Sequence, residues 1–235
     1  AVRTLKHLRS DVQVIVWTKE PYDQIASLCP DVDMTITDDD YRPDGLLINC
    51  DDPCPCGVYE SEARKIELSR PQIFCHAAGL PWLGLKPRLK PDYAVLRGLD
   101  LIRKLEECPR PWVGVVLRSA ERWKDWPHTI EFIRQLRKKM DLTVITIDRK
   151  LSVKGDERVI NATNLNLKQL VALIDLLDLL ITPDTGPLHV AEALDIDTIA
   201  LFGSMDSEIR KRTYQNSSVR YVQGRCPFGR SPCWY

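Results

Sequence analysis

Apolar runs of strand length recur along this chain and alternate with segments of helical periodicity. The runs are nearly continuous and rich in β-branched residues, a pattern typical of parallel strands that are covered on both faces. They occupy residues 12–17, 45–50, 113–117, 142–147, 177–181 and 198–202. Apolar residues at helical spacing lie between them at 128–140 and 166–176. Strands that alternate with helices predict an α/β protein.

A proline-rich segment divides the chain. Residues 81–111 contain five prolines, with a predicted helix at 92–105 in the middle. Such a segment is typical of an interdomain connection. Because 235 residues suffice for two domains of modest size, we predict one domain at 1–108 and a second at 109–235.

The charge balance bears on possible partners. Lysine plus arginine equal aspartate plus glutamate at 33 each, so the chain has no overall field to attract nucleic acid or an anionic membrane. No apolar run approaches the roughly 20 residues of a membrane span, and the first residues lack the apolar core of a signal peptide. We therefore expect a cytoplasmic protein with no nucleic-acid partner and at most peripheral contact with a membrane.

The eight cysteines are expected to be free thiols, because the chain is long and does not resemble a short secreted scaffold. Zinc binding by four of them is disfavoured, because the two cysteines of a zinc-binding pair are usually separated by two to four residues and neither pair here has that spacing. The remaining four are expected to be buried small apolar residues. The first set is Cys54, Cys56, Cys226 and Cys233, and the second is Cys29, Cys50, Cys75 and Cys108.

The most informative segment is residues 179–194, which predicts a strand, a tight turn and a helix. Asp184 and Thr185 can cap the helix, Gly186 permits close approach of another backbone, and Pro187 suits the first helical turn. The start of a helix at the carboxyl end of a parallel strand favours an anion such as a diphosphate. The alternative is an ordinary capped turn, which every α/β protein contains.

The sequence Asp-Thr-Gly-Pro-Leu-His at 184–189, followed by an alanine-rich helix and Ile-Ala-Leu-Phe-Gly-Ser-Met-Asp at 199–206, resembles the signature of the heptosyltransferases, glycosyltransferase family 9. The resemblance implies a GT-B fold, with two Rossmann-like domains whose parallel sheets face each other across a cleft. It also implies transfer of heptose from ADP-heptose. By the match, the nucleotide-sugar donor is contacted by Asp184, Thr185, Gly186, Leu188 and His189.

A second stretch, 115–127, is similar to the family's strand, small-residue loop and Lys-x-Trp-Pro helix entry. The resemblance places Lys124 near the donor phosphates, and a lysine with the Ser119 hydroxyl would offset the charge of a leaving diphosphate. The alternative is that Trp126 and Pro127 merely open a helix and Lys124 is a solvated surface charge.

Asp148 ends the strand predicted at 142–147. In nucleotide-binding sheets, an acid at the end of the second strand commonly holds a ribose hydroxyl. Alternatively, Asp148 with Arg149 and Lys150 forms a solvated loop with a local ion pair.

The first residues, up to about 36, look similar to the family's N-terminal domain just after its first strand and loop. The family's Gly-Asp pair, whose aspartate is thought to act as general base, has no counterpart ahead of Ala1, so no catalytic residue is assigned. We predict a metal-independent inverting glycosyltransferase that needs no cofactor and moves a sugar to a saccharide or lipopolysaccharide acceptor. The alternatives are a non-catalytic or truncated nucleotide-sugar-binding relative and, by fold likeness alone, a sugar-nucleotide epimerase.

Overall fold

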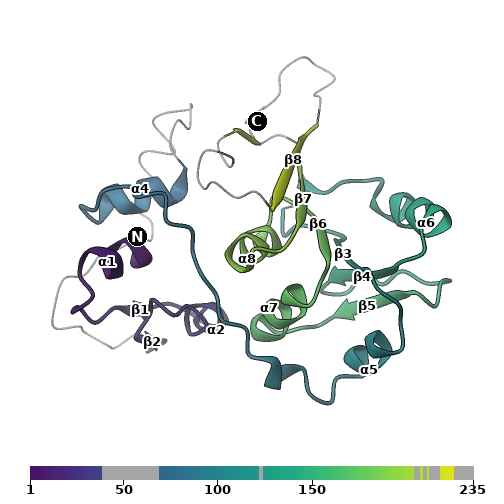
Figure 1. The fold of residues 1–235 in the computed structure, drawn as a ribbon, viewed down its shortest axis with the longest axis horizontal. Helices are drawn as coiled ribbons and strands as arrows, with labels where there is room; N and C mark the ends of the chain where they lie inside the picture. The colour runs from purple at the N-terminus through teal and green to yellow at the C-terminus, as the bar shows by residue number, and fades with distance from the viewer. Residues whose placement is uncertain (39–68, 122–123, 204–206, 209–210, 212–217, 225–235) are drawn as a thin grey trace. The chain divides into compact units, whose positions relative to one another are not determined.

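The structure is a computed structural model that describes residues 1–38, 69–121, 124–203, 207–208, 211 and 218–224. The chain divides into two compact units (Figure 1). The first is Ala1–Arg88 with Glu208–Gln215, and the second is Leu89–Ser207 with Asn216–Tyr235. The boundary at residue 88 precedes the predicted division near 108, because the helix that ends before residue 108 packs in the second unit.

The first unit contains a short parallel pair of strands and several helices. Strand β1 (Ile15–Trp17) pairs with β2 (Met34–Ile36), with Ile15 opposite Met34. The helices are α1 (Val2–Leu8), α2 (Asp23–Ala26) and α4 (Arg70–Ala77). The predicted strand at 12–17 is thus confirmed in its second half, and the one predicted at 45–50 lies outside the described residues.

The second unit is built on a parallel sheet of six strands among the described residues. They are β3 (Trp112–Val116), β4 (Thr143–Asp148), β5 (Val159–Thr163), β6 (Leu179–Pro183), β7 (Thr198–Phe202) and β8 (Val219–Gln223). Their order across the sheet is β5-β4-β3-β6-β7-β8. The chain therefore starts in the middle of the sheet, builds one half outwards, returns to the middle and builds the other half. This is the Rossmann order, and the direction reverses between β3 and β6.

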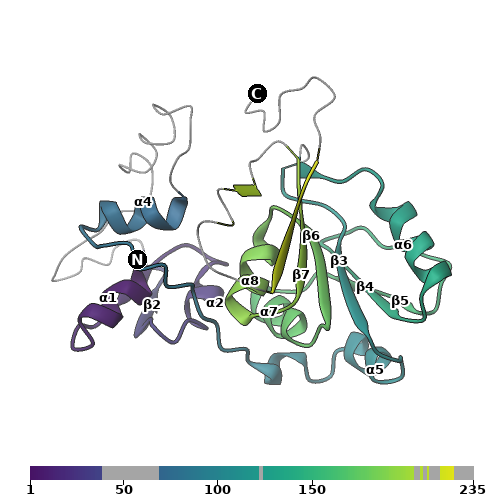
Figure 2. The same cartoon turned by 45° about the horizontal axis from the view of Figure 1, so that its top comes forward.

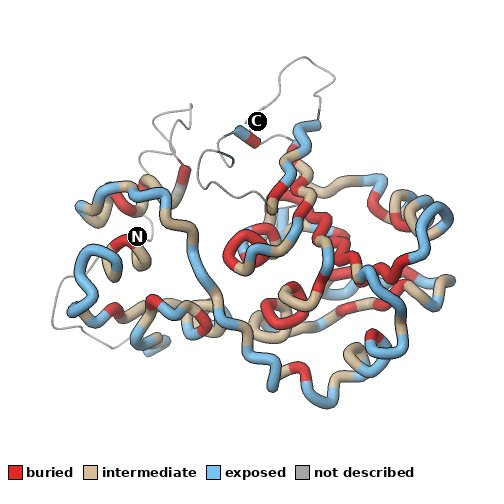
Figure 3. Tube along the Cα trace, in the orientation of Figure 1, coloured by how far each residue is buried: buried red, intermediate tan, exposed pale blue. Residues whose placement is uncertain are grey.

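Helices cover both faces of this sheet. Helix α6 (Thr129–Lys139) lies on one face, and α7 (Leu167–Asp175) and α8 (Gly186–Leu194) lie on the other (Figures 1 and 2). The burial of β3, β4 and β6 between these layers explains their nearly continuous apolar sequences (Figure 3). The sheet is therefore a rigid base for the turns that follow its strands.

The helix predicted at 92–105 is divided in two. A 3₁₀ turn, η1 (Tyr93–Leu96), begins where the Asp92 side chain accepts the N–H of Ala94. Helix α5 (Asp100–Glu106) follows after Gly98, whose φ of +77° is incompatible with a continuous α-helix. The prediction of a single helix was therefore wrong at this glycine.

Two edge strands of the second unit were not predicted. Strand β5 carries Asn161 at its centre, whose side chain bonds both the N–H and the carbonyl of Val153 and accepts from Thr146. Strand β8 has an exposed Arg220 and Val222. Polar and apolar residues mix in both segments, so neither shows the continuous apolar run by which the inner strands are recognised.

Three cysteines fall within the described residues, and all three are free thiols. Cys75 is fully buried, whereas Cys29 and Cys108 are only partly so, which corrects the expectation of full burial for these two. Burial raises the pKa of the Cys29 thiol. Cys50 and the four cysteines considered for zinc lie outside the described residues.

Among the described residues, no helix combines the length and the apolar character that a membrane crossing requires.

Candidate donor-binding site

The predicted site residues gather at the carboxyl edge of the sheet in the second unit. Ser119 and Lys124 follow β3, Asp148 ends β4, and Asp184 and Thr185 follow β6. These three strands are neighbours, with β3 in the middle. In open parallel sheets, ligands bind outside the carboxyl ends of the strands where the strand order reverses. Here that point lies between the turn that carries Lys124 and the turn that carries Asp184.

The turn after β6 leads directly into α8. Thr185 occupies the N-cap position with extended backbone, and Gly186 and Pro187 begin the helix. The Thr185 side chain makes no capping hydrogen bond, so this part of the capping prediction was wrong. A helix start leaves backbone N–H groups without intrahelical partners and carries a partial positive charge. Gly186 is exposed and has open space where a side chain would stand, so a ligand has access to the backbone there.

The turn after β3 is held closed by its own polar groups. The backbone N–H of Ser119 donates to Asp125 Oδ1 at 2.6 Å, and the N–H of Glu121 donates to Ser119 Oγ at 3.2 Å. The N–H of Lys124 donates to the carbonyl of Glu121. The Ser119 hydroxyl keeps its own hydrogen for donation, because it acts as an acceptor toward Glu121. The folded turn fixes where Lys124 leaves the backbone.

Lys124 joins the two turns. Its ammonium lies 2.8 Å from the carboxylate of Glu121 and 3.8 Å from that of Asp184. The Lys124 side chain is 21% exposed and that of Asp184 only 4%. Because Lys124 pairs with two carboxylates and is mostly buried, it is not the solvated surface charge considered as the alternative. It is a cation at the point where the strand order reverses.

Asp148 is occupied by neighbouring residues of its own loop. It forms a two-pronged ion pair with Arg118, at 2.9 and 2.7 Å, and also accepts the N–H groups of Lys150 and Leu151. The bonds from Arg118 outweigh the effect of partial burial and hold the pKa of the Asp148 carboxyl well below its usual range. The structure thus shows the local ion pair of the alternative reading, with Arg118 as partner in place of Arg149.

His189 lies in the first turn of α8 and is linked to a buried carboxylate. Its Nδ1 is 3.1 Å from Glu192 Oε2, one turn further along the helix. The other oxygen of Glu192 accepts the hydroxyl of Tyr221, on β8, at 2.8 Å. The His189 side chain is 46% exposed, so part of its ring is open to solvent.

Comparison with known proteins shows the family of the chain. The sequence model described as glycosyltransferase family 9 (heptosyltransferase) matches residues 76–227, which is more than half of the chain. The chain belongs to glycosyltransferase family 9. The match spans both turns of the site and the whole six-stranded sheet. The resemblance stated from the two sequence motifs is thereby confirmed. No curated protein sequence matches the chain.

Solved structures extend the likeness in fold to nearly the whole chain. A family 9 glycosyltransferase from Veillonella parvula superimposes with a TM-score of 0.65 at 13% identity, over 95% of this chain and 80% of the other. The E. coli ADP-heptose lipopolysaccharide heptosyltransferase II gives 0.61 at 16%, over 94% and 84%. The dodecameric iron-containing heptosyltransferase TibC, solved with ADP-D-β-D-heptose, gives 0.62 at 15%, over 99% and 60%. The predicted GT-B-like α/β class is therefore confirmed.

Leu188 was predicted as a donor contact from the resemblance alone. The Leu188 side chain is completely buried in a cluster with Ala200, Phe202 and Val219. Its backbone N–H donates to the carbonyl of Thr185 at 3.0 Å. Leu188 therefore anchors α8 on the sheet, and neither its side chain nor its N–H is directed to a ligand in this arrangement.

Sequence reasoning missed the residues that orient the site. Asp125 holds the N–H of Ser119, Arg118 holds Asp148, and Glu192 with Tyr221 holds His189. Asp125 and Arg118 stand inside the stretch that carries the second motif, so their position was a usable signal. Tyr221 had no such signal, because it reaches α8 through a strand that was not predicted.

Metal binding was considered as well. Within the part of the chain that the structure describes, no group of three or more His, Cys, Asp or Glu side chains is arranged to hold a metal ion.

Proposed function

We propose that this chain binds a nucleotide-sugar at the carboxyl edge of its six-stranded sheet and transfers the sugar to a saccharide or lipid-linked saccharide acceptor. The observation that carries the proposal is the contact between the two turns. Lys124, after β3, lies 3.8 Å from Asp184, after β6, beside the start of α8. A cation and a helix start at the reversal point of a Rossmann sheet form a site for a diphosphate.

The donor is proposed to be ADP-heptose. The matching family is described as heptosyltransferase, and TibC was solved with ADP-D-β-D-heptose. These matches favour ADP over other nucleoside diphosphates and heptose over other sugars. The proposal includes a cytoplasmic location. It also includes no nucleic-acid partner, in keeping with the balanced charge of the chain.

The chemistry proposed for the site is stabilisation of the leaving group. As the bond between the sugar carbon and the diphosphate oxygen breaks, negative charge grows on the departing diphosphate. Lys124, the Ser119 hydroxyl and the N-terminal end of α8 would together offset that charge, without a metal cofactor. Preformed donors are effective here because they need no reorganisation at the moment of reaction.

Asp184 is given a different role, because a carboxylate repels a phosphate. With its side chain buried, it holds Lys124 toward the reversal point, and an oxygen of the same carboxylate would accept a sugar hydroxyl. Glu121, which is 53% exposed, would release Lys124 more readily than Asp184 when a diphosphate binds. Inversion at the sugar carbon would follow from attack by the acceptor hydroxyl on the face opposite the diphosphate. The new carbon–oxygen bond forms as the bond to the diphosphate breaks, and the proton of the hydroxyl passes to water, since no residue is assigned as general base.

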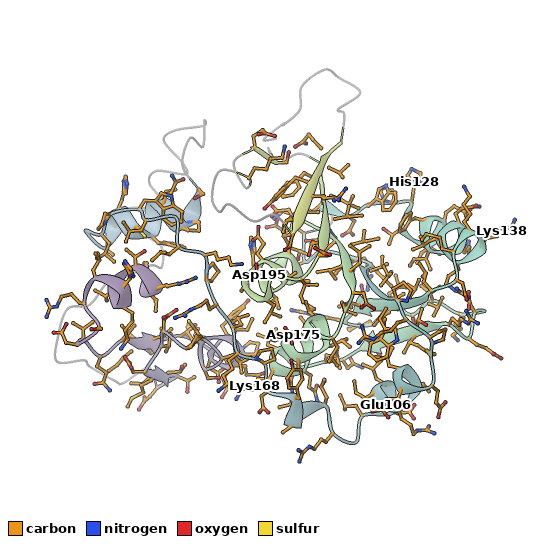
Figure 4. The ribbon with its side chains drawn as sticks, in the orientation of Figure 1. Glu106, His128, Lys138, Lys168, Asp175 and Asp195 are labelled. Carbon is orange, nitrogen blue, oxygen red and sulfur yellow. The ribbon has the colours of Figure 1, made fainter. Side chains whose placement is uncertain are left out.

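Calorimetric titration of the full chain with ADP, UDP, GDP and then ADP-heptose tests the proposal. We expect saturable binding of ADP, weaker binding of UDP and GDP, and loss of affinity in Lys124→Ala and Asp184→Ala. Lys138→Ala is the matched control, because Lys138 is exposed in the last turn of α6, away from the site (Figure 4). A folded protein that binds none of these nucleotides would contradict the proposal.

Product analysis then separates the proposed transferase from its alternatives. A transferase consumes ADP-heptose only when a saccharide acceptor is present, whereas an epimerase converts the free nucleotide-sugar. A non-catalytic relative binds the nucleotide-sugar and leaves it intact with or without an acceptor.

A further inference from the structure

Glu192 is a buried acidic residue that the proposed function does not use. It lies in the C-terminal half of α8, and only 2% of its surface is exposed. Charged side chains are almost never buried so completely unless they are paired. Both of its oxygens have partners, since Oε1 accepts the Tyr221 hydroxyl at 2.8 Å and Oε2 lies 3.1 Å from His189 Nδ1.

Tyr221 is itself held firmly in place. It lies opposite Ala200 in the parallel pairing of β7 and β8. Its ring packs against Phe202, with the centroids 5.7 Å apart, and Phe202 belongs to the same buried cluster as Leu188 of α8. The Tyr221 hydroxyl therefore reaches Glu192 from a fixed position in the sheet.

This chain of contacts determines which nitrogen of His189 carries hydrogen. An ionised carboxylate only accepts hydrogen bonds, and one oxygen of Glu192 already accepts from Tyr221. The bond to His189 therefore requires the hydrogen on Nδ1. In the neutral ring this leaves Nε2 with a lone pair and no hydrogen.

The free nitrogen lies at the end of α8 where the donor site is. Side chains on a helix lean toward its N-terminus, and His189 belongs to the first turn. Asp195, which ends the helix with a φ of +62°, marks the opposite end (Figure 4). His189 thus belongs to the same end of α8 as Gly186 and the turn that carries Asp184.

We infer that Glu192 and Tyr221 are positioning residues that hold His189 with its hydrogen on Nδ1, so that Nε2 accepts a hydroxyl of the donor's sugar. A neutral Nε2 without hydrogen has nothing to offer a phosphate oxygen, which is also an acceptor. His189 then distinguishes the nucleotide-sugar from the bare nucleotide, while Lys124 and the helix start bind the diphosphate common to both. This inference rests on the proposed function.

Nuclear magnetic resonance of the histidine ring nitrogens tests the positioning role without any substrate. The His189 signals are assigned by comparison with His189→Gln. We expect the hydrogen on Nδ1 in the wild type and on Nε2 in Glu192→Gln, because the new amide group donates to Nδ1. Tyr221→Phe should keep the hydrogen on Nδ1, because the Glu192 carboxylate still only accepts. A His189 ring that is unchanged in Glu192→Gln would overturn the inference.

Calorimetry tests the consequence for recognition. We expect His189→Phe, which can neither donate nor accept, to reduce the preference for ADP-heptose over ADP by roughly tenfold, the effect of one lost hydrogen bond, with ADP affinity itself retained. An unchanged preference would overturn the assignment of His189 to a sugar hydroxyl. Equal loss of affinity for both ligands would overturn it too, since that result indicates general damage to the site.

A matched control and a separate outcome complete the experiment. Glu131→Gln makes the same chemical change as Glu192→Gln on the exposed surface of α6 and should leave both the His189 form and the preference unaltered. If neither the wild type nor any variant binds ADP, the proposed function is wrong. The assignment of His189 to a sugar hydroxyl is then wrong as well. The resonance measurement then still decides whether Glu192 orients His189.

Discussion

Asp184 and Asp148 occupy equivalent places at the carboxyl edge of the same sheet, yet the structure uses them differently. Asp148 ends a buried parallel strand and Asp184 directly follows one, and each side chain is only 4% exposed. Asp184 faces Lys124 across the reversal point, whereas Asp148 is occupied by Arg118 and two N–H groups of its own loop. Two aspartates that look alike in sequence are thus distinguished by their partners: Asp184 pairs with Lys124 of another turn, and Asp148 pairs within its own loop and with Arg118.

The largest effect is expected from the partner of Asp184. Lys124→Ala should lower the turnover of a nucleotide-sugar by about 10² to 10³-fold, because it removes a preformed positive charge beside the leaving diphosphate. Steady-state kinetics with Lys138→Ala as control measures this change. Turnover similar to the control would show that the two turns meet without forming the donor site.

The buried residue that follows the turn after β6, Leu188, should affect the stability of the fold instead. Leu188→Ala is expected to lower the free energy of unfolding by about 3 kcal/mol, because it empties a fully buried position under α8. Urea denaturation measures the loss. A stable variant with greatly weakened ADP binding would instead return Leu188 to the ligand contacts.

Asp184→Asn sharpens the comparison most directly, because it keeps the shape of the side chain and removes its charge. Nucleotide-sugar affinity should fall about 10 to 100-fold as Lys124 loses its buried partner and the sugar loses an acceptor. Calorimetry on the folded variant measures the loss. Unchanged affinity would mean that Lys124 keeps its position without Asp184.

Asp148→Asn is the counterpart. It should lower the free energy of unfolding by about 1 to 2 kcal/mol, because the pair with Arg118 loses its charge. Its effect on ADP affinity should stay within about twofold. If ADP affinity falls sharply while the free energy of unfolding is unchanged, Asp148 contacts the ribose. The difference between the two aspartates drawn from the structure would then be wrong.

The pH dependence of stability gives the smallest expected signal. The pKa of Asp148 is lowered in the folded state, so its contribution is fully present above the unfolded value of about 4 and is lost as pH falls below it. The free energies of unfolding of wild type and Asp148→Asn, measured by urea denaturation, should therefore differ less at pH 3 than at pH 7. A difference that grows on acidification would contradict the assigned ion pair.

Much of the second unit was predictable from local sequence. The strand at 198–202 was expected at those residues, and the helices observed at Thr129–Lys139 and Leu167–Asp175 differ from the expected ones by one residue at each end. These elements are recognisable because both faces of the strand and one face of each helix are buried, so the apolar pattern repeats at the period of the element. The edge strands β5 and β8 lack that pattern.

The sequence by itself determined the fold class, the helix start after β6 and the pair of motifs that marks the family. Those features depend on the order and periodicity of nearby residues. Only the tertiary structure decided that Lys124 meets Asp184, that Arg118 occupies Asp148, that Leu188 points into the core and that Tyr221 reaches Glu192. The physical reason is that these contacts join separate strands of the sheet or its two layers. Which atoms meet there depends on strand order, register and packing, which the sequence of a single turn does not contain.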